Sequence, residues 1–249
     1  MTEWRVNVQG DDLDLEQLAV FLTSPRQQVR KEEGHFVLTS DRFDTCTDAD
    51  TVRKIATGVL DTLFGLARLR FGARIPFAVG NLRCVKDNGR TDYYVLLEGA
   101  SLTVRGGPTL VKMGSTGISE AVQPQDPMVE RALMLESDEL ISRVLRLYGK
   151  AVKVWKDLYP IYEIVEQDVG GENSLVAKGW TSGNQITQFT RTAGQSNATG
   201  YQPTDGVSKV EPPPNPMTDA QGRTFIDSLL TSWLTFKLQD GEQQAATPR

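Results

Sequence analysis

Four aspartates near the end of the first fifth of the chain have the chemistry to bind a hard cation. Asp41, Asp44, Asp48 and Asp50 lie close together in the sequence, and carboxylate oxygens are the ligands that Ca²⁺ and Mg²⁺ prefer. Their spacing does not match an EF-hand loop. Asp48 and Asp50 also stand at the start of an expected helix, where the helix dipole favours carboxylates. We therefore interpret them as turn and capping residues and expect no metal site.

A second acidic group has the residue types of a general acid and base. Glu163, Glu166 and Asp168 follow one another closely, and side chains three residues apart on a helix are neighbours. Two neighbouring carboxyl groups are the arrangement that proton transfer requires. Charged residues in the last turns of a helix are also often simply solvated. We favour that interpretation and assign no catalytic residue.

A basic stripe is the strongest candidate for binding. Arg143, Arg146, Lys150 and Lys153 fall within about 80° of one another at the helical period, away from the apolar face. The stripe is either a solvated side of a helix or a groove for an acidic partner or a nucleic-acid backbone. No aromatic residues are interleaved to stack on bases, so a nucleic acid would be held by its phosphates. The predicted binding residues are Arg143, Arg146, Lys150, Lys153 and, as weaker additions, Lys178 and Arg191.

The sequence lacks the common signatures of cofactors and catalytic centres. His35 is the one histidine, and Cys46 and Cys84 are far apart, so zinc-site spacing is absent. The sequence contains no GxxxxGK[ST] loop, no GxGxxG and no GxSxG. We expect no metal and no small-molecule cofactor.

Composition favours an ordinary globular protein of the cytoplasm. The 249 residues are 39% hydrophobic and 24% charged, with a net charge of −5 that opposes non-specific nucleic-acid binding. No run approaches the roughly 18 apolar residues that span a bilayer, and the acidic N-terminus does not resemble a signal peptide. Two cysteines suit a reducing compartment, where we expect buried thiols.

The first part of the chain predicts a small α+β domain over residues 1–112, with a mainly antiparallel sheet. Residues 4–8 and 35–40 have strand character, and apolar residues recur at helical spacing after Asp11 and after Thr47, the predicted N-cap. Gly72 is the predicted end of the second helix. Asp87-Asn88-Gly89 between two apolar runs predicts a hairpin, and residues 101–105 another strand.

The second part predicts a helical bundle. A Gly-, Ser- and Pro-rich linker at 113–126 precedes the bundle, which covers 127–238 and starts at Asp126-Pro127, and a flexible tail follows at 239–249. One helix is expected to run from Ser137 to Gly170-Gly171 with a kink at Pro160. Ser182 with Gln185, and Thr218 with Gln221, have capping-box spacing at the heads of two further helices.

Three runs in this part carry a family resemblance. They are WKDLYPIYEIVEQDVGG (155–171), GWTSGNQITQFTRTA (179–193) and PPPNPMTDAQGRTFIDSLLTSWL (212–234). Over about the last hundred residues the chain resembles a loosely characterised bacterial group with a HEPN-like helical domain, a module common in defence and toxin–antitoxin systems. The resemblance implies a four-helix bundle that forms dimers.

Active HEPN ribonucleases pair an arginine with a histidine a few residues later, and this pair is missing here. Gln195, Ser196 and Asn197 stand where a histidine would follow Arg191. Arg30 and His35 have the spacing by coincidence, in the other domain.

We therefore expect a non-catalytic interaction or dimerisation protein of a bacterial defence or stress system. Its helical domain would bind a protein partner, most simply a second copy, or RNA. One alternative is an RNA-processing enzyme with an unrecognised site that uses Arg191, Asp205 or Lys209. Another is a structural subunit of a larger assembly.

Overall fold

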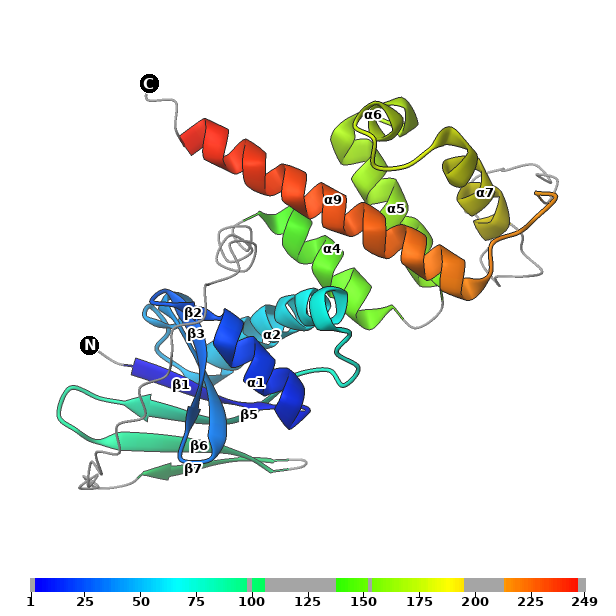
Figure 1. The fold of residues 1–249 in the computed structure, drawn as a ribbon. Coiled ribbons are helices and arrows are strands. Elements are labelled where there is room, and N and C mark those ends of the chain that lie inside the picture. The colour runs from blue at the N-terminus through cyan, green and yellow to red at the C-terminus, as the bar shows by residue number, and fades with distance from the viewer. Residues whose placement is uncertain (1–2, 98–99, 106–137, 152–153, 195–212, 246–249) are drawn as a thin grey trace. The chain divides into compact units, whose positions relative to one another are not determined.

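The chain divides into two compact units, Met1–Ser137 and Asp138–Arg249, which we call the sheet unit and the helical unit (Figure 1). The structure is a computed structural model and describes residues 3–97, 100–105, 138–151, 154–194 and 213–245. The predicted linker at 113–126 and the helix start at Asp126-Pro127 lie outside the described residues. The chain is of mixed α+β architecture, because an antiparallel sheet with helices precedes a part built from helices.

The described part of the sheet unit forms one antiparallel sheet. Its strands are β1 (Glu3–Gln9), β2 (Thr23–Ser24), β3 (Gln27–Glu32), β4 (His35–Ser40), β5 (Ala78–Val85), β6 (Thr91–Leu97) and β7 (Ala100–Arg105), and its helices are α1 (Asp12–Phe21) and α2 (Ala49–Phe71). The strand order is β2-β3-β4-β1-β5-β6-β7. Within it, β1, α1, β3, β4, α2 and β5 follow one another as a split β-α-β arrangement.

Alternation along the strands directs apolar side chains toward α1 and α2. On β1, Trp4, Val6 and Val8 are buried in one core with residues of both helices. The opposite face carries charge. There Glu32 accepts hydrogen bonds from Arg5 at 3.2 Å and from Arg83 at 3.1 Å, and it also pairs with Arg30. The sheet is thus apolar on one face and ionic on the other.

Local signals in the sheet unit are mostly confirmed. Gly72 ends α2 with φ 75°, and Gly89 takes φ 73° in the hairpin between β5 and β6. The predicted N-cap at Thr47 is wrong by one residue, since the Asp48 carboxylate accepts from the Thr51 amide at 2.8 Å. β3 is not evident in the sequence, because Val29 is its one apolar residue.

The described helices of the helical unit are α4 (Glu139–Lys150), α5 (Val154–Val169), α6 (Glu172–Ala177), α7 (Gly183–Ala193) and α9 (Asp219–Ala245). Pro160 lies inside α5 without ending it, and buried residues continue on both sides of it, as predicted. The single helix expected from Ser137 is wrong, since α4 ends at Lys150 and Ala151 is extended. α9 continues past residue 238 to Ala245, into the predicted tail.

Aromatic residues hold α5, α7 and α9 together. Phe189 of α7 stacks on Phe225 of α9 with ring centroids 4.7 Å apart, and Trp155 of α5 lies 5.6 Å from Phe189. The polar edges of the aromatic residues are satisfied by carboxylates, as when Trp155 Nε1 donates to Asp219 at 2.8 Å. Both predicted capping pairs form, at Ser182 with Gln185 and at Thr218 with Gln221. No helix in the described part of the chain is long and apolar enough to cross a membrane.

Candidate partner-binding face

The exposed side of α4 carries the predicted basic stripe. Asp138 caps the helix by accepting from the Leu140 amide at 2.9 Å. Burial of Ile141, Val144, Leu145 and Tyr148 then fixes which side of α4 faces outward. Arg143 and Lys150 are exposed on that side and Arg146 is half-buried. Lys153 lies outside the described residues.

Leu147 borders these cations and was missed by the sequence reasoning. It is 38% exposed, and at 100° per residue it falls next to Arg143 and Lys150 on the helical wheel. The signal for it was available, because Leu147 is an apolar residue off the apolar face. We call Arg143, Arg146, Leu147 and Lys150 the basic face.

The two arginines of the basic face, Arg143 and Arg146, have no ion-pair partner among the described residues. The carboxylates of Asp138 and Asp168 instead surround Lys237 of α9, at 3.7 Å and 3.0 Å. An arginine without a partner carboxylate attracts acidic groups from outside the molecule.

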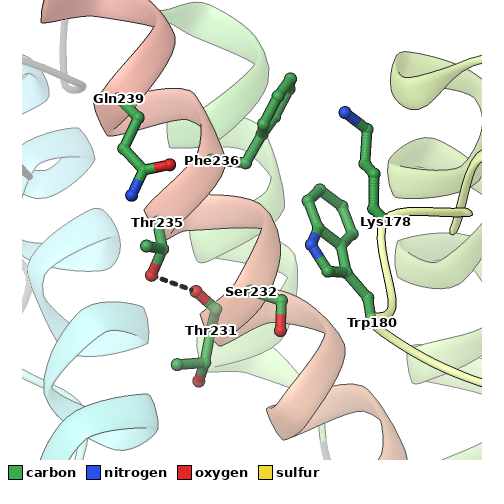
Figure 2. A pocket seen from close by; sticks show the side chains of 7 residues that line it. All are labelled: Lys178, Trp180, Thr231, Ser232, Thr235, Phe236 and Gln239. Carbon is green, nitrogen blue, oxygen red and sulfur yellow. Dashed lines mark hydrogen bonds between the residues drawn. The ribbon is translucent and has the colours of Figure 1, made fainter.

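Lys178 does not belong to the basic face. It is the C-cap of α6, and its ammonium lies 3.7 Å from the centre of the Phe236 ring of α9. Together with Trp180 it borders a hollow of about 440 Å³ whose other wall is α9 (Figure 2). The remaining lining residues are Thr231, Ser232, Thr235, Phe236 and Gln239.

One titratable side chain lines the hollow among the described residues. Apart from Lys178, its lining side chains are neutral. The hydroxyl groups of Thr231 and Thr235 donate to backbone carbonyls one turn earlier, each at 2.8 Å (Figure 2 shows the Thr235 bond). Both hydroxyl protons are therefore held in hydrogen bonds within α9. A second hollow of about 410 Å³ shares Trp180 and is likewise lined by neutral side chains.

Arg191 stands alone among the catalytic candidates. It is exposed in the last turn of α7, where a cation suits the helix dipole. Asp205 and Lys209, its proposed partners in an RNA-processing site, lie outside the described residues. In the described ranges, Arg191 forms no hydrogen bond or ion pair with another predicted binding residue.

Where the structure shows a role for one of the four aspartates of the sheet unit, that role is structural. Asp48 caps α2, and the amide and hydroxyl of Thr51 hold the pKa of its carboxyl below the ordinary value. In the part of the chain that the structure describes, no group of three or more His, Cys, Asp or Glu side chains is placed to hold a metal ion.

The second acidic group separates into two parts. Asp168 accepts from Trp233 Nε1 at 2.8 Å and from Lys237 Nζ at 3.0 Å, so it is a packing residue of α9. Among the described residues, Glu163 and Glu166 form no ion pair, and the backbone amide of Glu172 donates to the Glu166 carboxylate. Burial raises the pKa of both carboxyl groups, and repulsion by Glu172 and Glu163 raises that of Glu166 further.

Known proteins provide no match to this chain: no protein-family model, curated protein or solved structure is similar to it. The HEPN-like resemblance of the last hundred residues therefore stays a prediction. The basic face of α4 is the candidate site that the geometry itself supports.

Proposed function

We propose that the protein is a non-catalytic, cytoplasmic interaction protein whose helical unit binds an acidic protein partner through the basic face. The HEPN-like resemblance supports a place in a bacterial defence or stress system. The observation that carries the proposal is the composition of the face, in which the exposed Leu147 borders Arg143 and Lys150 on the exposed side of α4.

This composition favours a protein over a nucleic acid. Protein interfaces combine an apolar centre with a polar rim, and arginine is enriched in them. A phosphate backbone needs the cations but gains little from an exposed leucine. The net charge of −5 also opposes a broad attraction to nucleic acid. Leu147 is thus the residue that favours a protein partner over a nucleic acid.

The surroundings of the candidate residues support a role in binding and not in catalysis. Lys178 is the one titratable group among the described residues that line its hollow, and Arg191 forms no hydrogen bond or ion pair with a described acid or base. General acid–base catalysis needs a donor and an acceptor within hydrogen-bond reach of the reacting atoms.

The proposal is tested by capture from a lysate of the source cells with three baits. They are the wild-type chain, the triple variant R143E/R146E/K150E, and the control R26E/R74E/K156E. The control residues are exposed and form no ion pair in the structure, and both triple variants change the net charge equally. A tagged second copy of the chain is included in the lysate.

We expect a protein, or the tagged copy, to be captured by the wild type and the control and lost with the basic-face variant. Equal capture by all three baits would overturn the proposed face. Capture of RNA alone, lost on nuclease treatment, would replace the proposal with the nucleic-acid alternative.

A further inference from the structure

One wall of the hollow beside Lys178 is a hydrogen-bonded turn at the end of α6. Lys178 is the C-cap of this helix, and Gly179 reverses the chain with φ 71°. The amides of Trp180 and Gly179 donate to carbonyls in the last turn of α6, at 3.2 Å and 2.9 Å. These two bonds make up a Schellman motif, which ends a helix in one defined geometry. The backbone therefore fixes where the side chains of Lys178 and Trp180 start.

The opposite wall of the hollow is one side of α9. Its residues Ser232, Thr235, Phe236 and Gln239 follow one another at spacings that bring side chains together on a helix. The Phe236 ring contacts the Trp180 indole at an angle of 63°, with the ring centroids 5.6 Å apart. This contact joins the two walls. The hollow of about 440 Å³ between them has the size of a site for a small organic molecule.

Lys178 brings a positive charge that the hollow does not neutralise. Its exposed ammonium lies 3.7 Å from the centre of the Phe236 ring and 5.6 Å from that of Trp180. A ring face attracts a cation but carries no net charge of its own. Within the described ranges, this ammonium forms no hydrogen bond or ion pair, and no carboxylate lines the hollow. A ligand of negative charge therefore fits the site.

The hollow also offers neutral hydrogen-bond donors. The indole N–H of Trp180, the hydroxyl of Ser232 and the amide of Gln239 have no hydrogen-bond partner in the part of the chain that the structure describes. Figure 2 shows the indole nitrogen turned toward α9. A carboxylate accepts hydrogen bonds through both of its oxygens. It can therefore use the Lys178 ammonium together with one of these neutral donors.

Trp180 adds an apolar surface to the site. Its side chain is half-buried, and it borders the second hollow as well as the first. Met217, Ala220 and Phe225 line that second hollow and make it more apolar. Aromatic rings pack well on an indole. A carboxylate alone would leave this surface uncovered, whereas an attached aromatic ring would cover it.

We propose that this hollow binds a small aromatic carboxylate, whose carboxylate contacts Lys178 and whose ring packs against Trp180. Lys178 is the one cation that lines the hollow among the described residues. One cation matches one carboxylate, whereas a nucleic-acid backbone is held by several. The site contains no residue of the basic face, so the inference goes beyond the proposed function and does not depend on it.

The test is a titration of the full chain with benzoate and with naphthoate, followed by NMR of the indole N–H signals. The variant Trp180→Phe identifies the Trp180 signal by its loss. We expect both ligands to shift that signal with a Kd in the millimolar range, typical of a small ligand. The Trp4 signal should stay in place, because that indole is buried in the sheet unit and donates to the Cys46 carbonyl.

The charge is tested with Lys178→Gln, checked for its fold by circular dichroism. Removal of the ammonium should weaken naphthoate binding about tenfold or more, since a hydrogen bond to a charged group is lost. Lys156→Gln is the matched control, because Lys156 is exposed on α5 and forms no ion pair in the described ranges. On the wild type, the neutral amide naphthamide should bind about tenfold or more weakly than naphthoate.

Three results would overturn the inference. One is a Trp180 signal that neither benzoate nor naphthoate shifts. Another is binding by Lys178→Gln as tight as that by Lys156→Gln, or by naphthamide as tight as by naphthoate, since the ammonium would then not hold the carboxylate. The third is acetate that binds as tightly as naphthoate, since the ring would then contribute nothing.

Discussion

Gly222 near the start of α9 is predicted to tolerate no side chain, because Trp155 occupies the space. A Cβ at residue 222 would lie 2.7 Å from Cη2 of Trp155 and 3.0 Å from Cζ3. The indole is buried, its Nε1 donates to Asp219 at 2.8 Å, and it packs on Phe189. Gly222→Ala therefore has to displace a ring that is held on several sides.

The expected net effect is destabilisation. Overpacking a filled core costs about 1–3 kcal/mol, while replacing glycine by alanine inside a helix gains about 1 kcal/mol. We expect a loss of up to about 2 kcal/mol in the unfolding free energy of the helical unit. Gly58→Ala in α2 is the matched control, because nothing lies within 4 Å of its Cβ. That variant should gain about 1 kcal/mol in the sheet unit.

Both variants are measured by urea unfolding with circular dichroism and tryptophan fluorescence. Trp155, Trp180 and Trp233 report on the helical unit, and Trp4 reports on the sheet unit. If Gly222→Ala is as stabilising as Gly58→Ala, the indole does not pack on α9 as described. The packing of α5 against α9 would then be wrong.

Two further predictions concern carboxylates of the helical unit. Glu166→Gln should raise the melting temperature at pH 7 by removing like-charge repulsion, an effect of about 0.2–0.5 kcal/mol for a helix pair. The pKa of Glu166 is raised from 4.5 in the folded chain, so the charged carboxylate destabilises the fold only as pH rises above that value. The gain should therefore vanish at pH 4 in the same thermal scans. A gain that persists unchanged at pH 4 would contradict the repulsion. Asp168→Asn should lower the unfolding free energy by about 1–2 kcal/mol in urea titrations, since Trp233 and Lys237 both donate to that carboxylate, and an unchanged midpoint would contradict these bonds.

Local signals predicted much of the fold because they act over a few residues. Gly72 and Gly89 need positive φ, and Ser182 needs Gln185 three residues later, so each can be read directly from the chain. β3 was not predicted in the same way, because a strand beside the sheet edge needs few apolar residues. On its charged face Arg30 pairs with Glu32, and Glu32 also pairs with Arg5 of β1 and Arg83 of β5. Its position is set by pairing with β4, which is a long-range property.

The break after Lys150 was not predictable from apolar periodicity. Val144, Tyr148, Trp155 and Leu158 are all buried, so the phase of the apolar face continues across a helix end. The extended backbone of Ala151 is instead a property of the assembled helices.

The candidate site was predicted in part. Helical spacing is enough to bring Arg143, Arg146 and Lys150 onto one side of α4. The proximity of Glu172 to Glu166 was not predicted, because it depends on the turn at Gly170-Gly171 and the start of α6. Lys178 was assigned by charge alone, and the structure places it against Phe236 of α9.

The most direct measurement of the central claim is photo-crosslinking from the basic face. A photoreactive amino acid replaces Leu147 in one variant and Leu13 of α1, which is 69% exposed, in a control. The account predicts a crosslinked protein adduct from position 147, whether to a second copy or another protein, and none of that adduct from position 13. An adduct that forms equally from position 13, or fails to form from position 147 while the partner is still captured, would contradict it.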